Sequence, residues 1–237
     1  MISLNDSILG EVVNALVLND PESREQYLIA INNESGNGVE NSRHTYQWDY
    51  RYNTIVKIAM KYNLGYSKLE RGNLWQAVYL IGPNNEIYVF FSSKNLRSII
   101  RNGKDNHYLN LLNLFNENLD DLVPVEGQIS LNLGDNCSNK CKDIETLQMH
   151  AREVVKMMEN PPSKVIVIAF NKTITSTAEA LVFNTKNEIV WTKDLTSLIK
   201  NDYRFVLNSD DVVADQEESR TERESKKKQI VRLKNNR

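Results

Sequence analysis

The chain has 237 residues, of which 41% are hydrophobic and 25% charged, and its formal net charge is -2. This balance supports a packed core and excludes wholesale disorder, while two cysteines, five prolines and nine glycines exclude a disulfide scaffold or a Pro/Gly-rich fibre. No stretch approaches the ~18 consecutive apolar residues of a membrane span and the N-terminus has no signal-peptide pattern, so we expect a soluble, cytoplasmic protein with no membrane contact.

Residues 1–45 are predicted to form N-terminal helices and a loop. Apolar residues at helical spacing in "SLNDSILGEVVNALVL" predict a first helix, with Ser3 or Asn5 as its N-cap. Asp20-Pro21 ends that helix, and "ESREQYLIAI" predicts a second, shorter one. The Gly- and Asn-rich "NNESGNGVENS" is typical of an exposed loop.

Residues 46–120 are predicted to form a first α/β unit. It begins with the helix "YQWDYRYNTIVKIAMKYN", whose predicted buried stripe consists of Trp48, Tyr52, Ile55, Val56, Ala59 and Met60. The strands "YSKLERG", "LWQAVYLI" and "EIYVFFSS" follow, and "GPNN" predicts a hairpin turn between the last two. Two helices then close the unit, "KNLRSIIRN" with Asn95 as its N-cap and "NHYLNLLNLFNENL" with His107 as a capping or surface residue.

Residues 121–207 are predicted to form a second α/β unit packed with the first. The strand "GQISLNL" and the helix "DIETLQMHAREVVKMMEN" precede "KVIVIAF", whose continuous apolar run predicts a central strand. "EALVFN" and "EIVWTK" form a second hairpin, and "DLTSLIKN" a short helix. Residues 208–237 lose the apolar pattern and are predicted to be a flexible charged tail.

The two predicted units have identical residues at several matching positions. Residues 94–102 match residues 193–201 at five identical positions, and the hairpin letters Asn-Glu-Ile at 85–87 return at 187–189. Either a helix–hairpin–helix unit was duplicated, or turns, caps and cores converged on the same residues. The predicted fold is therefore α+β, with antiparallel hairpins flanked by helices, and the duplication stays open.

No motif for nucleophilic catalysis or phosphate binding is present. Cys137 and Cys141, followed by His150, lack the second ligand pair that a structural zinc site needs. Glu86 and Glu188 open the second strand of each hairpin, where a polar residue is expected on the solvent face. We expect no metal, no cofactor and no catalytic residue from these features.

The acidic stretch "DDLVPVEGQ" is the one arrangement that suggests an enzyme. Asp120, Asp121 and Glu126, with Gln128, could form a noncanonical acidic site of a metal-dependent nuclease. The carboxylate–x–lysine arrangement that usually accompanies such sites is missing, and paired acids in a loop are mostly solvated.

The helix "KNLRSIIRN" and the residue after Gly103 place basic residues along one stripe: Lys94, Arg97, Arg101 and Lys104. Leu96, Ile99 and Ile100 turn inward, so the stripe could follow phosphates or could be an ordinary solvated face. The second unit keeps Lys193 and Lys200 but has Thr196 where the first has Arg97.

The C-terminal tail is strongly asymmetric in charge. Residues 220–237 carry eight basic residues against two acidic ones, and the densest basic positions are Lys226, Lys227, Lys228, Arg232 and Lys234. Such an arm favours sequence-independent contact with DNA or RNA, although no aromatic residues alternate with the charges to stack on bases. The alternative is a solubilising tail.

The stretch "LERGNLWQAVYLIGPNNEIYVFFSSKNLRSI", followed by "HYLNLLNLFN", resembles an uncharacterised bacterial domain-of-unknown-function family over about residues 46–207. A glycine, a tryptophan, a hairpin and a lysine-started helix recur there in this order, and a basic tail is a loose feature. The resemblance implies no activity and no catalytic residue.

Three functions are therefore left open. The first is a non-catalytic accessory or regulatory protein that contacts nucleic acid, of the kind that phages or mobile elements carry. The second is a protein–protein interaction module, such as an inhibitor or immunity factor, and the third is the metal-dependent nuclease.

Overall fold

The computed structural model describes residues 2–17, 21–70, 75–102, 107–125, 144–172 and 175–200. Its helices are α1 (Asp6–Val17), α2 (Pro21–Ala30), α3 (Arg43–Lys61), α4 (Ser93–Asn102), α5 (Tyr108–Asn113) and α6 (Ile144–Val154), with 3₁₀ turns η1 (Leu114–Leu119) and η2 (Thr196–Leu198). Its strands are β1 (Gly65–Glu70), β2 (Gln76–Ile81), β3 (Glu86–Ser92), β4 (Lys164–Asn171), β5 (Thr177–Phe183) and β6 (Ile189–Asp194). The predicted α+β class is confirmed.

The described strands form one six-stranded sheet in the order β1-β2-β3-β4-β5-β6. Neighbouring strands run antiparallel except β3 and β4, which are parallel. The chain from the end of β3 to the start of β4 contains α4, α5, η1 and α6, as a parallel pair requires a long crossover connection. "KVIVIAF" is β4, and six consecutive residues of it are buried, which confirms the central strand.

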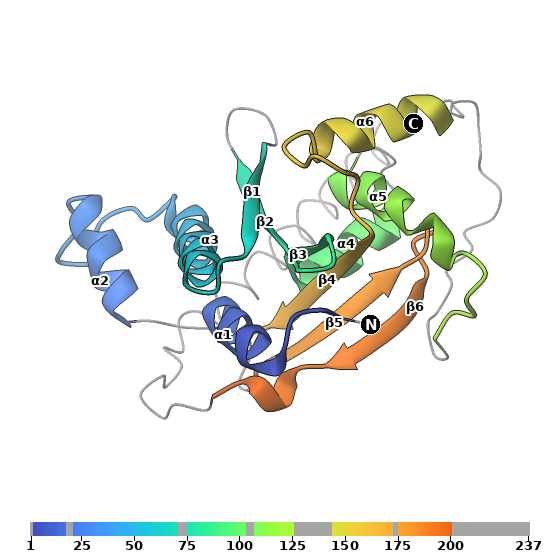
Figure 1. The fold of residues 1–237 in the computed structure, drawn as a ribbon. Coiled ribbons are helices and arrows are strands. Elements are labelled where there is room, and N and C mark those ends of the chain that lie inside the picture. The colour runs from blue at the N-terminus through green and yellow to red at the C-terminus, as the bar shows by residue number, and fades with distance from the viewer. Residues whose placement is uncertain are drawn as a thin grey trace, which may run out of the picture. The chain divides into compact units, whose positions relative to one another are not determined.

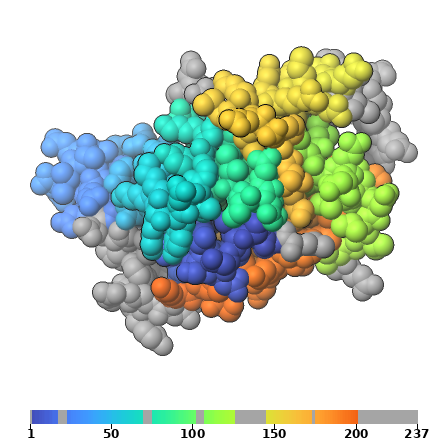
Figure 2. All heavy atoms as spheres, in the orientation of Figure 1, coloured from blue at the N-terminus to red at the C-terminus, as the bar shows by residue number. Residues whose placement is uncertain are grey.

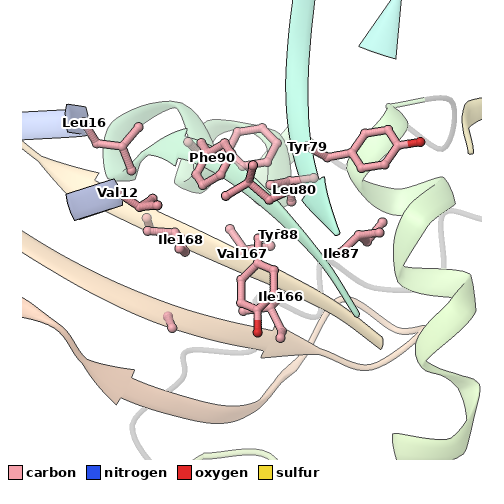
Figure 3. Close-up of a cluster of buried hydrophobic side chains, with 14 of the residues drawn as sticks. Val12, Leu16, Tyr79, Leu80, Ile87, Tyr88, Phe90, Ile166, Val167 and Ile168 are labelled. Carbon is pink, nitrogen blue, oxygen red and sulfur yellow. The ribbon is translucent and has the colours of Figure 1, made fainter. Parts of the chain in front are cut away.

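Helices cover both faces of the sheet (Figure 1). On one face α1 contacts β4 and α3 contacts β1 and β2, while α4 contacts β3 and β4 from the other face, where α5 also lies. Figure 3 shows Val12 and Leu16 of α1 lying over Ile168 of β4. Because strands with both faces covered bury successive side chains, β3 and β4 have continuous apolar sequences instead of alternating ones.

The two hairpin turns have the same backbone geometry. Asn85 has a φ of 58° and donates its N–H to the carbonyl of Gly82; Asn187 has a φ of 62° and donates to the carbonyl of Asn184. Asparagine adopts this left-handed conformation more readily than other non-glycine residues, so the turn itself selects the repeated asparagine. The element order α3–β1–β2–β3–α4 is followed later in the chain by α6–β4–β5–β6–η2, but a duplication remains a prediction.

The structure confirms one predicted cap and corrects another. The side chain of Asn5 accepts the N–H of Ile8 at 3.0 Å and so caps α1. Asn95 is not the cap of α4, because that helix begins at Ser93 and the hydroxyl of Ser92 accepts the N–H of Asn95 at 3.3 Å. The serine is better placed because it is the last strand residue, with its hydroxyl facing the first helical turn.

The short helix expected over residues 194–201 is only the single turn η2. The carboxylate of Asp194 accepts the N–H of Thr196 at 2.8 Å, and the Thr196 hydroxyl pairs with the carbonyl of Ala178 at 3.3 Å. These side-chain bonds compete with helix formation and hold the segment against β5. The expected strand "GQISLNL" lies outside the described residues.

Candidate nucleic-acid interface

Helix α4 presents the cationic stripe that its sequence predicts. Leu96 and Ile99 are buried with 4% and 9% exposure, whereas Lys94, Arg97 and Arg101 are exposed. The helix contains no acidic residue, so its outer face has no carboxylate of its own to neutralise the charge. From first to third cation the stripe spans about 10 Å, given a rise of about 1.5 Å per residue.

We call Lys94, Arg97 and Arg101 the α4 stripe. The other members of the predicted site lie outside the described residues: Lys104, Lys226, Lys227, Lys228, Arg232 and Lys234. In the part of the chain that the structure describes, no carboxylate pairs with Arg97 or Arg101.

The matching positions of the second unit have structural roles instead. The Nζ of Lys193 lies 2.7 Å from the carboxylate of Asp6, and the hydroxyl of Thr196 is bonded to the backbone of β5. Lys200 donates its backbone N–H to Asn14 at 2.8 Å. Of these three matched pairs of positions, those of the first unit lie on the exposed face of a helix, whereas those of the second unit lie in or beside the single turn η2.

Glu86 contradicts the expectation of a solvent-facing acid, since its residue is only 4% exposed. Its carboxylate accepts the N–H of Ser3 at 2.9 Å and the hydroxyl of Tyr88 at 2.7 Å, and the Nζ of Lys164 lies 4.0 Å away. Burial raises the pKa of Tyr88 well above its ordinary value, which keeps the phenol a donor. The N-terminal segment, more than 80 residues distant in sequence, covers this acid and makes it structural.

Glu188 is half-buried and accepts a bond from the side chain of Asn184 at 2.8 Å, within its own hairpin. The two glutamates therefore occupy matching turn positions but bind different partners. Neither carboxylate faces a cluster of other acids, and among the described residues no group of three or more His, Cys, Asp or Glu side chains could hold a metal ion.

One carboxylate of the acidic loop, that of Asp120, makes hydrogen bonds that stabilise the fold. The carboxylate of Asp120 accepts the backbone N–H of Thr185 at 2.9 Å and its hydroxyl at 2.6 Å. These bonds tie η1 to the turn between β5 and β6, while Asp121 is exposed. Glu126 and Gln128 lie outside the described residues, as do Cys137 and Cys141. The described geometry gives Asp120 a structural role.

His107 and His150 both belong to the connection between β3 and β4. His107 accepts the N–H of Leu109 on its Nδ1 at 3.1 Å and is the N-cap of α5, which confirms its predicted role as a capping residue. His150 is half-buried on α6.

Sequence reasoning missed an arginine. Arg51 is only 8% exposed, and its guanidinium carbon lies 5.4 Å from the ring centroid of Trp48 and 5.3 Å from that of Phe170. Helical spacing predicts that the flanking aromatic residues of α3 are buried, whereas an arginine between them is typical of a solvated face. Met60, at the other end of the same predicted stripe, is exposed instead of buried. Its burial depends on Phe170, 119 positions later in the numbering.

No helix among the described residues is both long and apolar enough to cross a membrane. No curated protein and no solved structure matches the chain. A family model described as "Family of unknown function (DUF5986)" matches residues 2–237, a longer span than the resemblance to an uncharacterised family covers in the sequence. Because the match covers nearly the whole sequence, this chain belongs to that family of unknown function.

Proposed function

We propose that this protein is a non-catalytic accessory or regulatory protein that contacts nucleic acid, with the α4 stripe as the folded part of the contact. The observation that carries the proposal is the exposure of Lys94, Arg97 and Arg101 on a helix without acidic residues. The basic residues of positions 220–237 supply further charge in the sequence. We also propose that the protein is cytoplasmic and of the kind that phages or mobile elements carry.

The number of phosphates that the protein neutralises sets the expected salt dependence of binding. A protein that neutralises Z phosphates loses affinity with a slope of about −0.9Z on duplex DNA and about −0.7Z on single strands in a log–log plot against salt. If the α4 stripe contacts three phosphates, its removal should lower the slope by about 2 to 3. The tail would add its own contribution, which truncation separates.

Fluorescence anisotropy with labelled DNA and RNA oligonucleotides across a salt series tests the proposal. The triple variant Lys94→Gln, Arg97→Gln, Arg101→Gln should bind more weakly and with the shallower slope. The matched control Lys57→Gln, Arg152→Gln, Lys156→Gln removes the same charge from exposed positions on α3, on α6 and beyond it, and should bind like the wild type. A chain that ends at Leu207 measures how much the tail contributes to the affinity and to the salt dependence.

Two outcomes contradict the proposal. Absence of binding to any of the oligonucleotides at about 50 mM salt, where phosphate contacts are strong, excludes nucleic-acid contact. Equal binding by the two triple variants excludes the α4 stripe. Incubation with Mg²⁺ or Mn²⁺ in the same series tests the nuclease alternative, which requires cleavage of DNA or RNA.

A protein-interaction module, such as an inhibitor or immunity factor, is the second candidate. Three apolar side chains that lie close together in sequence favour it, since Leu122, Val123 and Val125 are 40%, 84% and 36% exposed. Exposed apolar groups of this kind mark interaction surfaces when they are contiguous. Co-purification from the native host that is lost on Val123→Asp would support this function, and retention of the same partner would exclude this surface.

A further inference from the structure

The carboxyl ends of β3 and β4 lie side by side, because these are the neighbouring strands that run parallel. Ser92 at the end of β3 pairs with Phe170 near the end of β4. Ligands of sheets with parallel strands gather outside the carboxyl ends of those strands. Helix α4 begins at Ser93, so Lys94 and the start of the α4 stripe are at this same end of the sheet.

Five residues form an aromatic–arginine cluster at this end: Trp48, Arg51 and Tyr52 of α3, Trp75 beside β2, and Phe170 of β4. The Trp48 ring stacks on Tyr52 at 5.2 Å and meets Trp75 at 6.4 Å and Phe170 at 5.7 Å in edge-on contacts. The guanidinium of Arg51 lies against two of these rings, where a cation–π contact holds it.

The residues of the cluster differ in burial. Tyr52 and Phe170 are 4% and 2% exposed and belong to the hydrophobic core. Trp48 and Trp75 are only partly buried, although they pack against that core. Large rings that keep accessible surface while a rigid core supports them are suited to stacking against flat aromatic groups such as bases.

We propose that Trp48 and Trp75 stack against unpaired bases of a single-stranded nucleic acid that crosses the carboxyl ends of β3 and β4. The strand would pass from the cluster on the α3 face of the sheet to Lys94, at the start of the α4 stripe on the opposite face. This inference rests on the proposed function and narrows its ligand from nucleic acid in general to single strands. A duplex keeps its base faces inside the stack, so it can reach the cations but not the tryptophans. Arg51 lies against the Trp48 and Phe170 rings and belongs to the support of this surface.

The third tryptophan provides an internal control. Trp191 is half-buried on β6, at the opposite edge of the sheet from β1, and has no ring contact with a described residue. The substitutions Trp75→Leu and Trp191→Leu therefore remove the same side chain from the cluster and from an unrelated strand. Trp75→Phe keeps a stacking ring and should retain binding.

The test is anisotropy with an oligo-dT 12-mer and with a 12-base-pair duplex on the full chain, after urea unfolding shows that each variant is folded. Trp75→Leu should weaken oligo-dT binding about 10-fold, the size that loss of one stacked base predicts, and change duplex binding less than twofold. Trp191→Leu should change neither the affinity for oligo-dT nor the affinity for the duplex. In Trp191→Leu, oligo-dT should quench the remaining tryptophan fluorescence.

The two proposals fail in different ways. If the wild type binds neither oligonucleotide, nucleic-acid contact is excluded and the stacking surface with it. If Trp75→Leu binds oligo-dT like the wild type while the α4 triple variant binds it weakly, the α4 stripe stands and the stacking surface is excluded. If Trp75→Leu is unfolded, the variant Trp48→Phe, Trp191→Phe decides through quenching, because Trp75 is then the only tryptophan in the sequence. Absence of quenching of Trp75 by bound oligo-dT excludes stacking at this residue.

Discussion

Asn116 shows how one side chain can complete a sheet. β4 and β5 pair as far as Val167 and Leu181, and Val165 and Phe183 lie two positions further in that register. There the amide of Asn116 inserts between the strands, since it accepts the N–H of Val165 at 2.8 Å and donates to the carbonyls of Phe183 at 2.7 Å and Val165 at 3.2 Å. The strands separate without leaving buried backbone groups unpaired, which would be costly.

We expect Asn116→Ala to lower the free energy of unfolding by about 2–4 kcal/mol, because it leaves fully buried backbone donors and acceptors without partners. Urea unfolding followed by circular dichroism measures the change. Asp121→Ala, at an exposed position on the same segment, should stay within about 0.5 kcal/mol of the wild type. Equal midpoints for the two variants would contradict the role assigned to the amide.

At the scale of elements, α1 connects both predicted units. Glu11 accepts bonds from the Nζ of Lys61 and the hydroxyl of Tyr62, both at 2.6 Å, at the end of α3. On the other side Asn14 donates to the carbonyl of Leu198 at 2.9 Å, beside β6. In the space-filling view α1 touches both the teal atoms of the first unit and the orange atoms of the second (Figure 2). The helix is therefore part of the shared core.

The α1–α3 contact should depend on pH. The hydrogen bonds from Lys61 and Tyr62 lower the pKa of Glu11 below its ordinary value, so the folded state favours the charged carboxylate. The resulting stabilisation is complete above the unfolded pKa of about 4.3 and is lost as the pH falls through the lower folded value. Partial exposure of the carboxylate, at 32%, limits the effect to about 0.5–1 kcal/mol through solvent screening.

Glu11→Gln should therefore melt at a lower temperature than the wild type at pH 7, and the difference should shrink by about pH 3. Thermal unfolding at both pH values measures it. Glu25→Gln, exposed on α2, serves as the control with no difference at either pH. A Glu11→Gln difference that grows on acidification would show that the carboxylate is not stabilised in the charged form.

At the scale of the whole sheet, the two predicted units share one hydrophobic core. The same cluster of buried side chains includes Leu80 and Phe90 from the first unit and Ile168 and Phe183 from the second. The parallel pairing of β3 with β4 runs over seven residues and joins the two sets of three strands. A core of this kind should unfold in a single cooperative transition.

Single-tryptophan variants test that cooperativity. Trp48→Phe, Trp191→Phe leaves Trp75 to report on the first unit, and Trp48→Phe, Trp75→Phe leaves Trp191 to report on the second. In each variant, fluorescence and circular dichroism should give the same urea midpoint. If Trp75 or Trp191 changes before the circular dichroism does, the units unfold separately and behave as independent repeats.

Much of the fold, but less of the candidate site, could be predicted from the sequence. The hairpin turns, the His107 cap and the central strand were recoverable because each depends on residues close together in the chain. The cationic face of α4 followed from helical spacing. Arg51 was missed because its burial requires Phe170 on a distant strand.

The sequence by itself determined the local elements, since turn asparagines, caps and apolar periodicity act within a few residues. Only the tertiary structure decided that Glu86 is buried, that β3 and β4 run parallel, and that Trp48 and Trp75 share one cluster. Each of these depends on packing between segments separated by tens of residues. The free energy of such packing comes from removing water from the surfaces of both segments at once. It therefore cannot be inferred from either segment alone.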